Sequence, residues 1–421
     1  MSTNGMDAKR MLLHYQEVLD EEAREAKRQG KPVCWSSSVA PSEMCVAMDV
    51  AMVYPETHAA GIGARKGALD LLEVAENKGY SIDICSYARI NMGYMELLRE
   101  KVLTGKTPAK LQDSPAADVP LPDLIITCNN ICNTLLKWYE NLSVELNIPY
   151  IIIDVPFNHT MPVAGHNKDY IADQIRHAIR QLEDICGRPF AYDKFLAAQE
   201  QTQRSVAQWN RIASFMQYKP SPLNGFDLYN FMGLIVCARS RDYAEKTFKA
   251  FADELEAKLQ AGQYAFGDNE KFRVCSEGIA VWPYLSHAFK TLRSMGALVT
   301  GSAYPDTWNL AYTPGDLRGM GEAYSKTYMN TCIENRGQVL CDIVTRGQCD
   351  GLLLHLNRSC KLLSFLNAES AEIIQKNTGI PYVSYDGDQT DPRNFSPAQF
   401  DTRVQALGEM MAEAAATGGK A

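Results

Sequence analysis

The sequence DLIITCNNIC, residues 123–132, joins an apolar run to a cysteine that stands directly before a helical pattern. The segment Pro120–Cys128 is apolar over most of its length, as expected of a strand that is covered on both faces. Residues 133–146 then carry apolar side chains at helical spacing, and a second apolar run follows at 148–155. Strand, helix and strand in this order predict a parallel sheet.

The second half of the chain repeats this pattern. Residues 350–360 read DGLLLHLNRSC, so that the Asn-x-x-Cys spacing of Asn129 and Cys132 recurs at Asn357 and Cys360. In both halves the helix that follows leads to Ile-Pro-Tyr and then to an aspartate four residues later. We therefore predict an α/β protein with two similar parallel-sheet domains.

The strand signal disappears between the two halves. Apolar side chains between about 170 and 262 recur at helical spacing, which predicts a helical segment between the domains. We expect an N-terminal α/β domain at residues 1–165, the helical segment at 166–265 and a C-terminal α/β domain at 266–421. Further strands are expected at Tyr80–Cys85, Gly278–Trp282, Ala297–Gly301, Gly351–Leu356 and Pro381–Tyr385.

Composition excludes several classes of protein. The 421 residues include 42 Lys and Arg against 50 Asp and Glu, a net charge of -8 without a basic stripe, which disfavours a nucleic-acid partner. No apolar run approaches the roughly 20 residues of a membrane span, so no membrane partner is expected. The polar N-terminus, MSTNGMDAKR, predicts a cytoplasmic protein. In a reducing cytoplasm some of the 12 cysteines are expected to bind metal or do chemistry.

Three cysteines, Cys85, Cys132 and Cys360, share one expected place, just beyond the end of a strand. Open α/β sheets build their sites there, and backbone N–H groups at helix starts stabilise thiolates. Three thiolates from separate segments suit an iron–sulfur cluster with one open iron. Spacing alone leaves open that these are buried small hydrophobes, the interpretation that we keep for most other cysteines. Cys128 is the strongest rival ligand.

Two shorter segments carry polar groups that could do chemistry. Residues 34–38, Cys-Trp-Ser-Ser-Ser, are a turn or helix cap in the commoner case, and a substrate contact in the other. Residues 54–58, Tyr-Pro-Glu-Thr-His, are either an acid/base pair or a hydrogen-bonded loop.

The glycines of residues 61–67 have the spacing G-x-G-x-x-x-G, which disfavours nicotinamide binding and leaves close backbone packing or a phosphate contact. The chain has no P-loop motif for ATP hydrolysis.

Several motifs together resemble the α-subunits of the (R)-2-hydroxyacyl-CoA dehydratase family, which are relatives of the benzoyl-CoA reductases. The similarity spans nearly the whole chain, and its motifs are W-S-x-S-V (35–39), Y-P-E (54–56), S-I-D-I-C-x-Y-A-R (81–89), C-N-N-I-C-N (128–133), K-W-Y-E-N (137–141), N-G-F-D (224–227), N-R-S-C-K (357–361) and D-G-D-Q-x-D-P-R (386–393). The resemblance implies a [4Fe–4S] cluster on Cys85, Cys132 and Cys360. It also implies that Ser38 and Glu56 are catalytic residues near the open iron.

The resemblance also implies a reaction and partners. The β-hydrogen of a 2-hydroxyacyl-CoA is not acidified by the carbonyl, and the family adds one electron to give a ketyl radical that expels hydroxide. Segments 55–67, 157–162 and 395–407 point to (R)-lactoyl-CoA as substrate, with acryloyl-CoA and water as products. The alternatives are a bulkier substrate, 2-hydroxyisocaproyl-CoA or phenyllactoyl-CoA, or a non-catalytic electron-transfer subunit. The implied partners are a homologous β-subunit with its own cluster and an ATP-dependent iron–sulfur activator protein.

Overall fold

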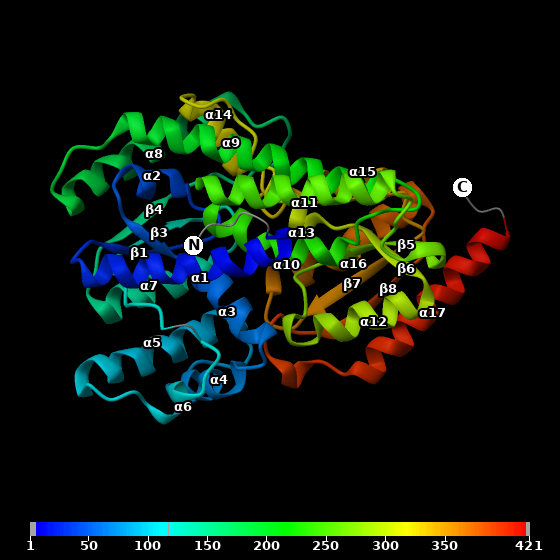
Figure 1. Ribbon diagram of the computed structural model, residues 1–421, viewed down its shortest axis with the longest axis horizontal. Helices are drawn as coiled ribbons and strands as arrows, with labels where there is room; N and C mark the ends of the chain where they lie inside the picture. Colours follow the sequence, from blue (N-terminus) through cyan, green and yellow to red (C-terminus); the bar gives the residue numbers. More distant parts are fainter. Residues whose placement is uncertain (1–5, 117, 418–421) are drawn as a thin grey trace.

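The computed structural model contains two four-stranded parallel sheets that lie side by side, with helices packed around them (Figure 1). It describes residues 6–116 and 118–417. The strands of the N-terminal sheet are β1 (Val33–Ser36), β2 (Ala51–Val53), β3 (Leu124–Cys128) and β4 (Tyr150–Ile153). Those of the C-terminal sheet are β5 (Phe272–Glu277), β6 (Ala297–Gly301), β7 (Gly351–Asn357) and β8 (Tyr382–Gly387). The α/β class and the two similar parallel sheets are thus confirmed.

The two sheets have the same topology. The strand order is β2-β1-β3-β4 in one and β6-β5-β7-β8 in the other, and every pairing is parallel. In each sheet the chain moves outward in one direction from the first strand and then in the opposite direction from the third. The crevice between these two central strands is the topological switch point, where open α/β sheets bind ligands. Each domain therefore offers one such crevice, beyond β1 and β3 or beyond β5 and β7.

Helices account for most of the remaining chain. The longer ones are α1 (Ala8–Arg28), α3 (Pro55–Ala64), α4 (Ala68–Asn77), α5 (Ser86–Thr104), α7 (Asn133–Leu146), α8 (Gly165–Cys186), α9 (Tyr192–Ser214), α10 (Gly225–Ala238), α11 (Asp242–Gln260), α12 (Leu285–Met295), α14 (Leu317–Ser325), α15 (Ile333–Gly347), α16 (Lys361–Thr378) and α17 (Pro397–Ala416). The short ones are α2 (Ser42–Ala47), α6 (Ala109–Gln112) and α13 (Ala303–Asp306), with 3-10 turns at Phe215–Gln217, Gly267–Asn269, Trp282–Tyr284 and Pro392–Asn394.

Both faces of the N-terminal sheet are covered, because successive side chains of a strand point to opposite sides. Cys34, Leu124 and Ile126 pack into a core shared with helices α8 to α11, whereas Trp35 and Ile125 pack into a second core with α4, α5 and α7. The helical segment that follows β4 is therefore continuous with the N-terminal core. The boundaries 165/166 and 265/266 stay a prediction.

Two of the expected strands are wrong. Residues 80–85 form a turn, and Cys85 is the N-cap of α5. Residues 278–282 follow β5 instead of forming a strand, because the strand begins earlier, at Phe272. Residues 80–85 alternate apolar and polar side chains as a strand does, but Ile82 is exposed, so the alternation marks no buried face. Residues 278–282 are a short apolar run, and such a run does not by itself identify a strand. The other expected strands are confirmed, with ends that differ from the prediction by at most four residues.

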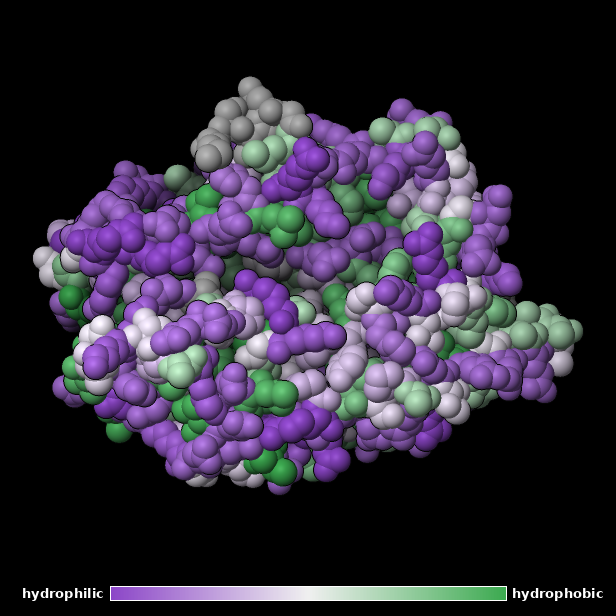
Figure 2. Space-filling model, turned by 60° about the horizontal axis from the view of Figure 1, so that its bottom comes forward, coloured by the Kyte–Doolittle hydropathy of each residue, from purple (hydrophilic) through white to green (hydrophobic). Residues whose placement is uncertain are grey.

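The helices were compared with the length and hydropathy of a membrane-spanning segment. Among the described residues, no helix combines the length and the apolar character needed to cross a bilayer. On the face shown in Figure 2, hydrophobic side chains occur in separate small groups among hydrophilic ones.

Candidate active site

Three helices start at the three cysteines that the sequence singled out. Cys85 is the N-cap of α5, Cys132 that of α7 and Cys360 that of α16. The first two helices belong to the N-terminal domain and the third to the C-terminal domain. All three thiols are free and half-buried, whereas Cys128, the rival ligand, is buried in the hydrophobic core.

The three sulfurs influence one another electrostatically. Burial raises the pKa of each thiol to about 12. The charge of Cys132 adds to the pKa rise of Cys85, that of Cys360 to the rise of Cys132, and that of Cys85 to the rise of Cys360. Because such effects act over short distances, the three side chains lie in one region, to which both domains contribute.

Backbone N–H groups at the helix starts act in the opposite direction. The N–H of Leu135 donates to the sulfur of Cys132 at 3.4 Å. The N–H groups of Ala88 and Leu363, three residues beyond Cys85 and Cys360, lower the pKa of those thiols. Each helix start therefore favours negative charge on its sulfur, which burial alone disfavours.

This donor set fits a metal cluster better than a single ion. Within the described residues, no group of three or more His, Cys, Asp or Glu side chains is placed to hold one metal ion. Ligands of a cluster lie farther apart than those of one ion, because each sulfur binds a different iron. The three free thiols each lie at a helix start, and the charge of one raises the pKa of the next. They therefore fit an iron–sulfur cluster with three protein ligands.

Glu56 and Ser38 lie together beside this region. Glu56 is in the first turn of α3, and its Oε1 accepts the backbone N–H of Ser38 at 3.1 Å. Burial raises the pKa of Glu56 above its usual value, and hydrogen bonds from Tyr139 and Ser38 partly oppose this rise. The charge of Glu56 also raises the pKa of Cys132. The structure therefore brings all five predicted site residues into one electrostatically connected region.

Two residues of this region were not found as site residues from the sequence. The Tyr139 hydroxyl donates to Oε2 of Glu56 at 2.6 Å, and it also lies 3.2 Å from the Ser36 carbonyl. Tyr139 lies two helical turns beyond Cys132, on the same face of α7. The helical period could therefore have identified it as a neighbour of the site. Arg239 is fully buried and donates to the backbone carbonyls of Ser38 and Ala40 at 3.4 and 2.6 Å. No local motif marks Arg239, because these two contacts join residues about 200 positions apart along the chain.

The glycine-rich segment after Glu56 has a packing role. A Cβ atom built on Gly63 would lie 2.4 Å from Cγ2 of Thr390, so only glycine allows α3 to approach the 388–391 loop. This confirms the expected close backbone packing. His58, the other acid/base candidate, lies edge-on against the ring of Tyr94 at 4.7 Å.

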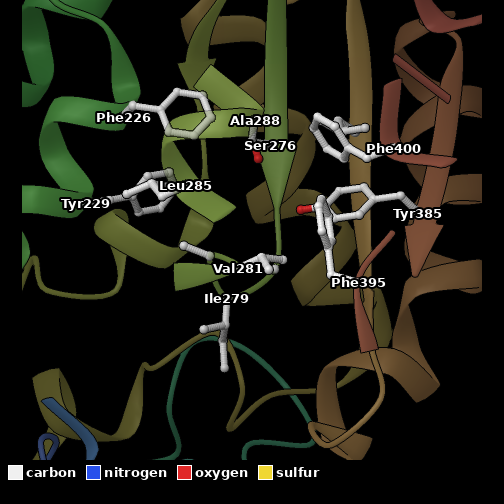
Figure 3. Close-up of a pocket in the computed structure, with 13 residues that line it drawn as sticks. Phe226, Tyr229, Ser276, Ile279, Val281, Leu285, Ala288, Tyr385, Phe395 and Phe400 are labelled. Carbon is white, nitrogen blue, oxygen red and sulfur yellow. The ribbon is translucent and has the colours of Figure 1, made fainter. Parts of the chain in front are cut away.

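A separate hollow lies between α10 and the C-terminal domain (Figure 3). It has a volume of about 20 Å³ and is lined mainly by apolar and aromatic side chains, with Phe226 and Tyr229 on one side and Tyr385, Phe395 and Phe400 on the other. None of the five predicted site residues lines it.

Comparison with known proteins identifies the family of this chain. Residues 37–411 match the family model described as 2-hydroxyglutaryl-CoA dehydratase, D-component. The chain is 64% identical to the lactoyl-CoA dehydratase subunit alpha of Anaerotignum propionicum, over 97% of both chains. It is 43% identical to the (R)-2-hydroxyisocaproyl-CoA dehydratase alpha subunit of Clostridioides difficile, over 93% of both. A benzoyl-CoA reductase chain of Thauera aromatica is 24% identical over 88% of this chain and 86% of its own length. The resemblance seen in the motifs is thus confirmed, and this chain belongs to the 2-hydroxyglutaryl-CoA dehydratase D-component family.

Proposed function

We propose that this chain is the α-subunit of a dehydratase that converts (R)-lactoyl-CoA to acryloyl-CoA and water, with a [4Fe–4S] cluster on Cys85, Cys132 and Cys360. The observation that carries the proposal is the convergence of these three helix-capping thiols beside Glu56 and Ser38. Family membership and the 64% identity to a lactoyl-CoA dehydratase subunit support the reaction.

The reaction needs more than acid/base groups. Hydroxide leaves the α-carbon and a proton leaves the β-carbon, but the thioester carbonyl acidifies only α-hydrogens. Held by Cys85, Cys132 and Cys360, a cluster would supply an electron-transfer path and a Lewis-acidic iron for the thioester or hydroxyl oxygen. The net conversion of a 2-hydroxyacyl-CoA to an enoyl-CoA and water is redox-neutral, so it would consume no electron.

The chain's own residues would bind the substrate and transfer protons to or from it. The Ser38 hydroxyl, at the switch point of the N-terminal sheet, would donate a hydrogen bond to the substrate oxygen. The carboxyl group of Glu56, whose pKa burial raises above its usual value, is suited to exchange a proton with the substrate. Tyr139 and the Ser38 N–H hold one oxygen of Glu56 each, which fixes the carboxyl plane. Either protonation of the leaving hydroxyl or removal of the β-proton is compatible with this position.

A bulkier acyl chain is the nearest alternative, supported by the 43% identity to a 2-hydroxyisocaproyl-CoA dehydratase subunit. A non-catalytic electron-transfer subunit is the alternative from another class. Ser38 and Glu56 argue against it, because an electron relay has no use for a hydroxyl group and a carboxyl group beside an open iron.

The proposal includes the setting of the reaction. The alpha-subunit relatives support a homologous β-subunit as partner, for which we propose a cluster of its own. An ATP-dependent iron–sulfur activator would deliver the electron, since the chain contains no P-loop. We propose that the complex works in the cytoplasm.

The test is an assay without oxygen. The chain is purified with its β-subunit and mixed with the activator, ATP and a reductant. It is then given lactoyl-CoA, 2-hydroxyisocaproyl-CoA or phenyllactoyl-CoA. Preferential formation of acryloyl-CoA supports the proposal. Faster turnover of a larger substrate would assign that substrate to the enzyme in place of lactoyl-CoA. A complex that contains iron but turns over none of the three substrates would favour the electron-transfer subunit.

A further inference from the structure

Gln389 places a side-chain amide against one of the three cysteine sulfurs. It is fully buried in the loop after β8, and its Nε2 donates to Sγ of Cys85 at 3.2 Å. The sulfurs of Cys132 and Cys360 accept no comparable side-chain donor among the described residues. Gln389 comes from the C-terminal domain and Cys85 from the N-terminal domain, so this hydrogen bond crosses between them.

The surrounding hydrogen bonds fix which end of the amide faces the sulfur. Oδ1 of Asn357 accepts the backbone N–H groups of Ser359 and Cys360, both at 3.3 Å, so its Nδ2 must point away from them. That Nδ2 donates to Oε1 of Gln389. Since Oε1 is occupied in this way, the amide nitrogen of Gln389 is the atom left to face Cys85.

The same contacts hold Gln389 in place. Its backbone carbonyl accepts the N–H of Trp282 at 3.0 Å. Both neighbours in the loop are also anchored across the domain boundary, because Asp388 and Thr390 bond to the hydroxyl of Ser86, the residue after Cys85. The amide is therefore preorganised and does not need to reorient when charge on the sulfur changes.

We propose that Gln389 is a positioning residue that donates a hydrogen bond to the Cys85 thiolate and thereby raises the reduction potential of the cluster. This rests on the proposed function, which places a cluster on Cys85. A hydrogen bond to a ligand sulfur stabilises the more negative, reduced state, and it is strong in a buried site. The family motif D-G-D-Q at 386–389 thus gains a role that no ligand or acid/base assignment gives it.

The test compares Gln389→Met and Gln389→Glu with the wild type, as full chains purified without oxygen and loaded with iron and sulfide. Met removes the donor, whereas Glu keeps the acceptor toward Asn357 and replaces the donor by an oxygen. Both variants keep the three cysteines, so iron content should be unchanged. In a redox titration followed by electron paramagnetic resonance, the midpoint potential should shift to more negative values, at least as far for Glu as for Met.

Gln199→Met is the matched control. Gln199 is also fully buried and donates to a sulfur, that of Met320 at 3.2 Å, but it lies away from the three cysteines. Its loss should leave the potential unchanged. Normal iron with an unchanged potential in either Gln389 variant would overturn the role of Gln389 alone. A wild-type chain that takes up no iron would overturn the proposed cluster, and the role of Gln389 with it.

Discussion

Asp123 and Asp350 make the same two hydrogen bonds, one pair in each domain. The Asp123 carboxylate accepts the N–H of Val33 at 2.9 Å, and its own N–H donates to the Val33 carbonyl at 2.7 Å. Asp350 repeats both bonds with Arg273, at 2.8 and 2.7 Å. Each aspartate thereby joins the starts of the two central strands, so the sequence repeat is also a repeat of structure.

The first prediction concerns this strand-joining bond. Asp350→Ala leaves the N–H of the buried Arg273 without its acceptor, which should lower the free energy of unfolding by about 1 to 3 kcal/mol. Urea denaturation measures the change. Asp113→Ala, at an exposed aspartate, is the control and should remain within about 0.5 kcal/mol of the wild type. An equal effect of both substitutions would contradict the role of Asp350.

The second prediction concerns the cluster ligands. Replacing Cys85, Cys132 or Cys360 by Ala should strongly reduce bound iron, because each supplies one of three sulfurs. Cys128→Ala and Cys275→Ala should keep it, since both cysteines are buried in hydrophobic cores. Iron and sulfide analysis of protein purified without oxygen makes the comparison. Equal iron in all five variants would refute the ligand assignment.

A third prediction tests Glu56 as the proton-exchanging group. Glu56→Gln should keep the cluster and lower turnover by about 100- to 10,000-fold, the usual contribution of a general acid or base. Iron content and turnover are measured on the same preparation. An active Glu56→Gln enzyme would exclude the acid/base role.

Tyr139→Phe provides a fourth, separate test through pH. The Tyr139 hydroxyl lowers the pKa of Glu56, which burial raises, so its removal should raise that pKa further. The limb of the pH–rate profile that reports Glu56 should then move to higher pH. A limb that stays in place while turnover falls would mean that Tyr139 acts without influencing Glu56.

The fifth prediction concerns stability in acid. Burial favours the neutral form of Asp391, but hydrogen bonds from Arg393 and Arg89 outweigh this and hold its pKa below the usual value. Arg393 also lowers the pKa of Glu76. A carboxyl group with a lowered pKa stabilises the fold at every pH above its pKa in the unfolded chain, which is near 4. This contribution is lost as the pH falls through the lower pKa of the folded chain.

Arg393→Met should therefore destabilise the chain at neutral pH and make its stability less sensitive to acid below about pH 4. Thermal unfolding of both proteins across this range measures the difference. Parallel pH curves for variant and wild type would show that these carboxylates do not depend on Arg393.

The sequence by itself determined the α/β class, the two-fold repeat and the candidate cysteines. Periodicity and the repeated Asp, Asn and Cys positions are local, so they can be read from neighbours along the chain. Helix α7 begins and ends where its apolar spacing predicted, at Asn133 and Leu146. The turn at residues 80–85 was not predicted in this way, because its apolar and polar residues alternate like those of a strand although Ile82 is exposed.

Only the tertiary structure decided how the two domains complete one site. Cys85 meets Gln389, Glu56 meets Tyr139, and Ser38 is held by Arg239, across separations of 83 to 304 residues. Such contacts depend on how the two sheets and their helices pack. No local sequence pattern shows which residues so far apart along the chain will meet. The chemistry of each residue is thus fixed by its type, but its pKa, its partner and its orientation arise from burial within and between the domains.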